Sequence, residues 1–333
     1  MADEFVNEEE LQEGAADETS VCEPEPAKAE ETEKPEYQSA ETAPAPEDKK
    51  PTNPKKRVGL IVAIVILAVA IIGGGAYWFV NYQIPHQQAV DAFNTAVAGL
   101  DSRTAEVDAA IADLQALQGG EDKPLDEAVN TAASNAIGQA QAAKQSAPEM
   151  PSDTDAINEA AKQVDAMGDY AETLASLASA KQALQNSIDQ LKQVTNPTEA
   201  FVIERITGLE NITGVEAVTE TNDPNGKLGK AGGYTASVYF SSDLVDHANV
   251  YPNSSYTGIV ADGNDGGGCV EVYATAEEAA KRNDYLAAFD GGIFASGSHE
   301  VLGTCVLRTS DKLTASQQKA LTQEVKESLI RLN

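Results

Sequence analysis

The longest apolar stretch of the sequence lies between Arg57 and Asp91, where no Asp, Glu, Lys or Arg occurs. Residues 58–80 are almost wholly apolar, and about 20 such residues are enough to cross a lipid bilayer. A core helix of a soluble domain would keep a polar face at helical spacing, whereas residues 60–67 are apolar on every side. The pattern therefore predicts a single transmembrane helix over residues 58–80.

The two ends of this apolar stretch differ in chemistry, because basic side chains precede it and aromatic side chains end it. The residues expected at the two membrane interfaces are Lys55, Lys56, Arg57, Tyr77, Trp78 and Tyr82. Basic residues stay on the cytoplasmic side of a span, so we expect a cytoplasmic amino terminus and an extracytoplasmic carboxyl terminus. A cleaved signal peptide would occupy about the first 15 to 30 residues. More than fifty residues precede this stretch, which favours an uncleaved signal anchor.

Residues 1–57 combine high charge with repeated prolines. They carry 17 acidic and 7 basic side chains and seven prolines. Such a segment buries too little apolar surface to offset its chain entropy, so we expect a disordered cytoplasmic tail. Two roles are open for this tail, a solvated spacer or a docking segment for a basic cytoplasmic partner.

Beyond residue 85, apolar positions recur at helical spacing in an alanine-rich sequence. Between Val90 and Leu114 they follow alternating steps of three and four residues, which is the seam of a coiled coil. Glycine and proline breaks separate this helix from a second over about residues 124–143 and a third over about residues 152–195. Short loops between three helices predict a helical bundle or coiled-coil stalk over residues 85–196.

The carboxyl-terminal residues 197–333 show a different pattern. Alternation over Tyr234–Ser241 predicts a half-buried strand with one face in water, and a further strand is expected over residues 301–308. Capping sequences at Thr275 and Thr314 open two helices. These residues are therefore predicted to form an α+β domain, in which helices cover one face of a small, mainly antiparallel sheet.

Composition narrows the classes of function. Asp+Glu 53 against Lys+Arg 23 gives a formal charge of −30. This charge argues against a nucleic-acid-binding protein, because contacts to phosphates need clustered Lys and Arg. An aromatic content of 5% together with many alanines favours slender helical packing over a large aromatic pocket.

Three stretches of the carboxyl-terminal domain carry a resemblance. They read NDPNGKLGKAGGYTASVYF (residues 222–240), KRNDYLAAFDG (residues 281–291) and SGSHEVLGTCVLRTS (residues 296–310). This set resembles a module at the carboxyl end of single-pass envelope proteins of Gram-positive bacteria. The resemblance implies a place in the cell envelope and the order tail, span and ectodomain. It implies no reaction and no catalytic residue.

Two polar loops contain candidate ligand-binding residues. The first is a turn whose carboxylate, amide and ammonium groups lie beside a pair of glycines, a combination that suits an anionic ligand. Its candidates are Asp223, Asn225, Lys227 and Lys230. In the second loop, Asp262 and Asp265 offer oxygen ligands that suit Ca²⁺, but the alternate spacing of a calcium loop is absent and a tight connection is the alternative. We expect no resident metal and no cofactor.

Two pairs of residues are expected to interact across the predicted strands. Cys269 and Cys305 lie outside the expected span, where disulfides persist, so they form a disulfide candidate. Alternation along the strands would turn the two thiols to opposite faces, which leaves this pairing open. Glu271 and Arg308 are expected to form a cross-strand ion pair.

The sequence predicts a single-pass membrane-anchored cell-envelope protein that presents a ligand- or partner-binding domain on a helical stalk. We expect no enzymatic activity, because the residue types of a serine triad occur without a Gly-x-Ser-x-Gly elbow. Those residues are Asp290, Ser296, Ser298 and His299. Two alternatives stay open, an extracytoplasmic enzyme acting on envelope polymers and a membrane regulator that recruits a cytoplasmic partner through its acidic tail. The expected partners are the lipid bilayer and an envelope polymer or protein, and a homodimer through the span is also open.

Overall fold

The computed structural model describes residues 54–292 and 295–332 of the chain. Residues 1–53 of the tail that is expected to be disordered lie outside the described residues. The side chains of Lys55, Lys56 and Arg57, expected at the membrane interface, are also outside the described part. The chain divides into two units, Met1–Ala68 and Val69–Asn333.

The apolar stretch forms helix α1, Pro54–Trp78. Among the described residues, one helical stretch, which starts at Ile61, is long and apolar enough to cross a membrane, and none of its most apolar window is buried inside the protein. Ile66 is 64% exposed and Ile72 is 71% exposed, so large aliphatic side chains face outward along this helix. A helix of a soluble protein would bury such side chains.

A π-helical segment, Phe79–Gln83, follows α1 directly and leads into helix α2, Ile84–Gln118. Pro85 lies in the first turn of α2. Proline lacks the N–H of an α-helical bond and crowds the carbonyl four residues earlier. The wider π turn accommodates it, and the N–H of Ile84 donates to the carbonyl oxygen of Phe79. Trp78, Tyr82 and His86 stack in sequence along this segment, with ring centroids 5.8 and 5.7 Å apart.

Helix α2 packs against three shorter helices, α3 (Ala128–Ala143), α4 (Thr154–Asp165) and α5 (Ala171–Gln193). The predicted seam is confirmed, because Phe93, Leu100 and Leu114 of α2 are all buried in it. Its first half packs on α4 and its second half packs on α3 and α5. Alanines fill much of both contacts, which allows the helices to approach closely.

The single helix expected over residues 152–195 is wrong, because the chain breaks between α4 and α5. Gly168 has a φ of +73° there, and a Cβ atom at this position would lie 2.7 Å from Leu100 Cδ1. Glycine alone adopts this backbone conformation at low cost. The break lets α4 and α5 pack on different parts of α2.

Gly168→Ala is expected to lower the free energy of unfolding by about 1–3 kcal/mol, because it adds left-handed strain to a steric clash. Thermal unfolding of the purified full chain in detergent, followed by circular dichroism at 222 nm, measures this change. Gly138→Ala is the matched control, since Gly138 lies within α3 with nothing within 4 Å of an added Cβ. The control should stabilise by about 0.5–1 kcal/mol. Equal effects of the two substitutions would contradict the assigned role of Gly168.

The carboxyl-terminal part is an α+β domain, as the sequence predicts. Its strands are β1 (Ile212–Ala217), β2 (Ala236–Ser242), β3 (Gly267–Val272), β4 (Ser298–Leu302) and β5 (Cys305–Thr309). They form one sheet in the order β1-β2-β3-β5-β4, and every pairing in it is antiparallel. The helices are α6 (Glu199–Ile206), α7 (Gly258–Asp262), α8 (Ala276–Ala287) and α9 (Ala315–Ile330). Single 3₁₀ turns occur at His247–Asn249 and Gly263–Gly266.

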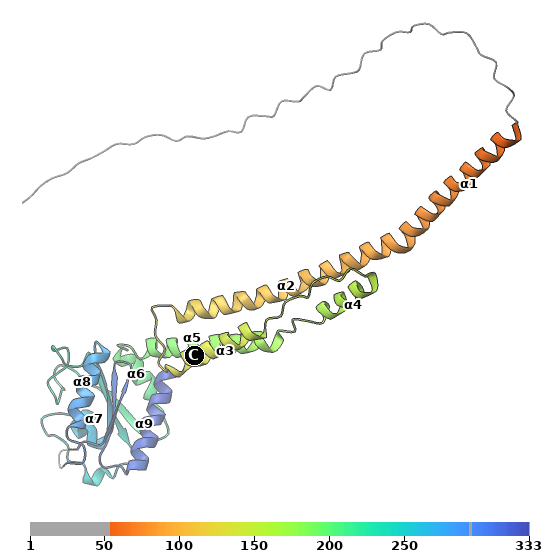
Figure 1. Cartoon of the computed structure of the whole chain (residues 1–333). Helices are drawn as coiled ribbons and strands as arrows, with labels where there is room; N and C mark the ends of the chain where they lie inside the picture. Colours follow the sequence, from red (N-terminus) through yellow and green to blue (C-terminus); the bar gives the residue numbers. More distant parts are fainter. Residues whose placement is uncertain (1–53, 293–294, 333) are drawn as a thin grey trace, which may run out of the picture. The chain divides into compact units, whose positions relative to one another are not determined.

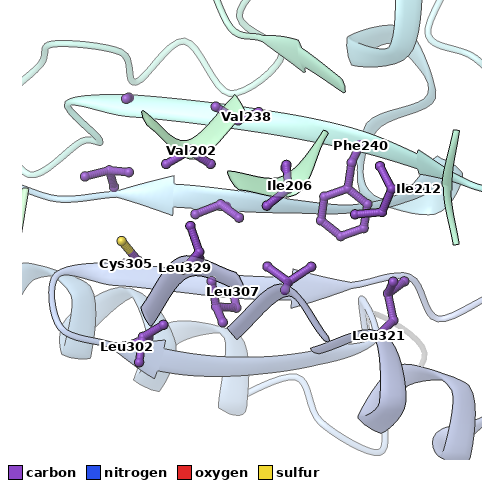
Figure 2. Close-up of a cluster of buried hydrophobic side chains, with 14 of the residues drawn as sticks. Val202, Ile206, Ile212, Val238, Phe240, Leu302, Cys305, Leu307, Leu321 and Leu329 are labelled. Carbon is purple, nitrogen blue, oxygen red and sulfur yellow. The ribbon is translucent and has the colours of Figure 1, made fainter. Parts of the chain in front are cut away.

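Helices cover both faces of this sheet, so the prediction that they cover one face is wrong. Figure 1 shows α7 and α8 on one side of the sheet and α9 on the other. Helices α6 and α9 cover the first face, where Val202, Ile206 and Leu329 pack on Phe240 and Leu307 (Figure 2). On the second face, side chains of α7 and α8 pack on the opposite sides of β2, β3 and β5.

The second face is also the one that the sequence pattern predicts to be in water, and that prediction is wrong. Ser237 and Tyr239 of this face are 0% and 3% exposed. Its polar groups are buried because hydrogen bonds and an ion-pair network satisfy many of them, as polar burial requires.

The single strand expected over residues 301–308 is a hairpin of β4 and β5. Gly303 turns the chain with a φ of +60°, and its Cα lies against the backbone of Val194. The N–H of Thr304 donates to the carbonyl oxygen of Val194 at 3.0 Å. Val194 directly follows α5 and is buried in the core of the sheet domain. The hairpin turn therefore contacts the carboxyl end of α5.

Candidate functional site

Two rows of side chains cross the sheet on the face that α8 covers. Strand pairing aligns one residue of each of β2, β3, β5 and β4 in each row. The rows are Ser237, Glu271, Val306 and Val301, and next to it Tyr239, Cys269, Arg308 and His299. A charged Glu271 at the middle of a buried sheet face needs partners, because an isolated buried carboxylate is costly.

Glu271 has three hydrogen-bonding partners and no exposed surface. Arg282 of α8 donates two hydrogen bonds to the Glu271 carboxylate, from Nε to Oε2 at 2.7 Å and from Nη2 to Oε1 at 2.9 Å. Arg308 of β5 donates to Oε1 at 2.9 Å, which confirms the predicted cross-strand ion pair. Tyr273 donates its hydroxyl to Oε2 at 2.9 Å. These bonds connect α8 to the centre of the sheet.

The charges of this network favour ionised Glu271. Burial alone would raise its pKa, but the hydrogen bonds from Arg282 and the positive charges of Arg308 and Arg282 outweigh burial and hold the pKa below its usual range. Two guanidinium groups face one carboxylate, so the network carries a net positive charge. Arg282 is partly exposed and brings this charge to the surface beside α8.

The loop before β2 is held together by Asp223. Its carboxylate accepts from the backbone N–H groups of Asn225 at 3.0 Å and Leu228 at 2.8 Å, and from the hydroxyl of Tyr234. Burial opposes ionisation, but these donors keep the pKa of Asp223 below its usual range. Asp223 is thus fully engaged within its own loop. Lys230 also turns back to the loop, and its Nζ donates to the carbonyl oxygen of Gly226 at 2.6 Å.

A pocket of about 560 Å³ lies between this loop and α8. The loop side contributes Asn225, Lys227, Gly232, Gly233 and Tyr234, and the helix side contributes Glu278, Lys281, Arg282 and Tyr285, with Tyr273 between them. Of the predicted ligand-binding residues, Asn225 and Lys227 line this pocket. Asp223 and Lys230 do not line it, although both hold the shape of the loop.

The charged groups of the pocket differ in how far they are already paired. The ammonium group of Lys227 makes no hydrogen bond or ion pair with any residue that the structure describes, whereas the backbone of Lys227 is hydrogen-bonded within the loop. Lys281 pairs with the exposed Glu277 at 2.9 Å, and Arg282 is held by Glu271. Three positive side chains and one negative one, Glu278, therefore surround the pocket, in a chain whose formal charge is −30.

The other two candidate ligand-binding residues, Asp262 and Asp265, are not among the residues that line this pocket. Asp262 is the last residue of α7, and Asp265 pairs with Lys312 at 3.3 Å. Across residues 54–292 and 295–332, no group of three or more His, Cys, Asp or Glu side chains is placed to hold a metal ion.

Cys269 and Cys305 are both free and buried. The candidate disulfide, which the sequence left open, does not form, because the two thiols belong to the cores on opposite faces of the sheet, as the alternation along the strands indicated. Burial raises the pKa of each thiol to about 12, so both are poor nucleophiles.

The residue types of a serine triad do not assemble. His299 contacts Asn283 at 2.7 Å and Asp290 at 3.3 Å. Ser296 accepts a hydrogen bond from Arg308, and the hydroxyl of Ser298 meets that of Thr309. Neither serine hydroxyl bonds to His299 among the contacts of the described chain.

The residues of α8 that line the pocket were missed in the sequence. A signal for Arg282 was present, because Glu271 stands between Val270 and Val272 in a strand that is buried on both faces. A carboxylate at such a position requires a buried cation, and two arginines lie in the predicted elements that follow. The sequence does not show that Arg282 would be one of these partners, because this contact depends on how α8 packs across the sheet.

Comparison with known proteins gives one partial match. Residues 2–88 match the family described as mobile element protein CD1107-like. The match covers about a quarter of the chain, the segment up to the start of α2, and does not reach the pocket. No curated protein and no solved structure matches the chain.

Proposed function

We propose that this protein is a single-pass membrane protein of the cell envelope whose stalk presents an anion-binding domain outside the cell. The observation that carries the binding role is the pocket beside α8. There an unpaired Lys227 faces the positive end of a buried ion-pair network in an otherwise strongly acidic chain. A positive cavity in an acidic protein selects for an anion that the rest of the surface repels.

The composition of the pocket favours binding over catalysis. General acid–base chemistry draws on paired carboxylates or histidine within reach of a substrate. The lining residues include one carboxylate and no histidine, and the exposed ring of Tyr285 gives the pocket an apolar wall. Such a mixture of apolar walls and a few placed charges is typical of small-molecule sites. An enzyme acting on envelope polymers is therefore the weaker proposal.

The membrane location is supported by α1 and its flanks. The exposed aliphatic side chains of α1 need a nonaqueous environment, and the stacked rings of Trp78 and Tyr82 follow at its carboxyl end. The basic residues that precede the apolar stretch favour a cytoplasmic amino terminus, which would place the pocket on the extracytoplasmic side.

Benzoate and benzamide form a matched pair of probes for this proposal, because they differ chiefly in charge. The full chain in detergent should bind benzoate at least fivefold more tightly than benzamide, as judged by ligand-observed NMR titration. Lys227→Gln should weaken benzoate binding about fivefold, since a partly exposed ion pair contributes about 1 kcal/mol.

Lys230→Gln is the control for this experiment, because it removes the same charge from the same loop outside the pocket. It should leave the affinity for benzoate nearly unchanged. Equal binding of benzoate and benzamide, or an equal loss in the two lysine variants, would refute the anion site.

A further inference from the structure

One carboxylate oxygen of the pocket has no partner. Glu278 Oε2 is buried and accepts no hydrogen bond from any described residue. Its own helix does not supply a donor, because Arg282, one turn later, is bound to Glu271 and Lys281 is bound to Glu277. A carboxylate oxygen withdrawn from water without a donor costs free energy, and the nearby charge of Lys281 attracts the carboxylate without a hydrogen bond to this oxygen. Glu278 lines the pocket, so a rotation of its flexible side chain would bring this oxygen to a ligand that carries a donor.

The pocket therefore contains one group that suits an anion and one group that suits a cation. Lys227 offers an unpaired ammonium group to an anion, and Glu278 offers an unpaired carboxylate oxygen to a cation or N–H group. The hydroxyls of two lining tyrosines are already committed, that of Tyr273 to Glu271 and that of Tyr234 to Asp223. Both of these tyrosines are almost fully buried, whereas the third lining tyrosine, Tyr285, is 58% exposed and offers a ligand its ring, which suits aliphatic or aromatic groups.

We infer that the ligand is zwitterionic, an amino acid or short peptide with a free amino group and a free carboxylate. Its carboxylate would bind beside Lys227 and its ammonium group would bind Glu278, while a side chain packs on the exposed ring of Tyr285. A volume of about 560 Å³ lies within the usual range for small-molecule sites, so a dipeptide fits such a space. This inference rests on the anion site proposed above and adds the second charge.

Blocked forms of one dipeptide test the ammonium site and the carboxylate site separately. The probes are alanyl-phenylalanine, its N-acetyl form, its carboxamide form and the doubly blocked form, titrated against the full chain in detergent by ligand-observed NMR. The free dipeptide should bind about tenfold more tightly than either singly blocked form. The doubly blocked form should bind most weakly.

Glu278→Gln tests the ammonium site directly. This variant should bind the free and the N-acetylated dipeptide with similar affinity, and it should bind benzoate more tightly than the wild-type chain, because the substitution removes the negative charge of the pocket. Glu204→Gln is the control, because Glu204 is an exposed residue of α6, on the other face of the sheet. It should retain the tenfold preference for the free amino group.

The outcomes distinguish this inference from the function on which it rests. If the wild-type chain binds the N-acetylated and free dipeptides equally but still prefers benzoate to benzamide, the zwitterionic ligand is refuted and the anion site stands. If neither benzoate nor any dipeptide binds, both are refuted. The comparison of blocked probes uses the wild-type chain, so it holds even if Glu278→Gln fails to fold.

Discussion

Replacing Glu271 by glutamine should destabilise the carboxyl-terminal domain by about 3–5 kcal/mol. The substitution leaves Arg282 and Arg308 close together without their shared carboxylate, and Arg308 is almost fully buried. Breaking a buried ion pair from one side is costly, because the remaining charge stays desolvated. Urea unfolding of the full chain in detergent, followed by near-ultraviolet circular dichroism of the tyrosines, measures the change.

Glu277→Gln is the matched control for this substitution. Glu277 pairs with Lys281 on the exposed side of α8, and such surface pairs contribute about 0–1 kcal/mol. If Glu271→Gln costs no more than this control, the network does not stabilise the domain as described.

The ion-pair network of Glu271 also makes the free energy of unfolding depend on pH. The pKa of Glu271 is lowered in the folded protein from a usual value of 4.5, so the folded state binds fewer protons than the unfolded state. The stabilisation is therefore present above about pH 4.5 and is lost as the pH falls through the lower, folded pKa. Stability of the wild-type chain should decline with acid in this range, and Glu271→Gln should flatten that decline.

Placing two aspartates at the middle of α1, Ile66→Asp with Leu67→Asp, should move the protein out of the membrane fraction. Each charged residue at the centre of a span costs about 2.5–3.5 kcal/mol, so the pair costs about 5–7 kcal/mol. Both side chains are more than 60% exposed, so no packing inside the protein opposes the change. Fractionation of cell membranes after alkaline extraction measures the distribution.

Exchange of the two aliphatic residues, Ile66→Leu with Leu67→Ile, is the control and should leave the protein in the membrane. Protease added outside intact cells should also leave residues 1–57 uncut in the wild-type chain. Retention of the double aspartate variant in the extracted membrane, or loss of the amino-terminal tail to external protease, would contradict the proposed topology.

The sequence predicted correctly those features that depend on residue spacing within one helix or on the pairing of two strands. The capping box at Thr314 forms as expected, and Phe93, Leu100 and Leu114 are buried in the predicted seam. The Glu271–Arg308 pair was predictable because both residues lie on neighbouring strands. Each of these features depends on spacing within an element or on one strand pairing.

Features that depend on contacts between distant segments were not predictable in this way. Gly168 ends a helix because the side chain of Leu100, far away in the sequence, occupies the space of a Cβ. The polar face of β2 was expected to be solvent-exposed, because the alternation in the sequence does not show that a helix covers this face and that Arg282 of that helix pairs with Glu271 of the neighbouring strand β3. Of the pocket, the loop residues Asn225 and Lys227 were found, whereas the contribution of α8 depends on how that helix packs on the sheet.

The π-helical turn before Pro85 has a consequence for the coupling between α1 and α2. A π turn holds one more residue than an α turn, so the side chains after it are rotated by about 100° relative to an uninterrupted α-helix. The buried seam of α2 is therefore offset by this fixed rotation from the face that residues 69–78 of α1 would otherwise continue. Deletion of one residue from the π turn would remove this offset, whereas exchanges between aliphatic residues of α1 would leave it unchanged.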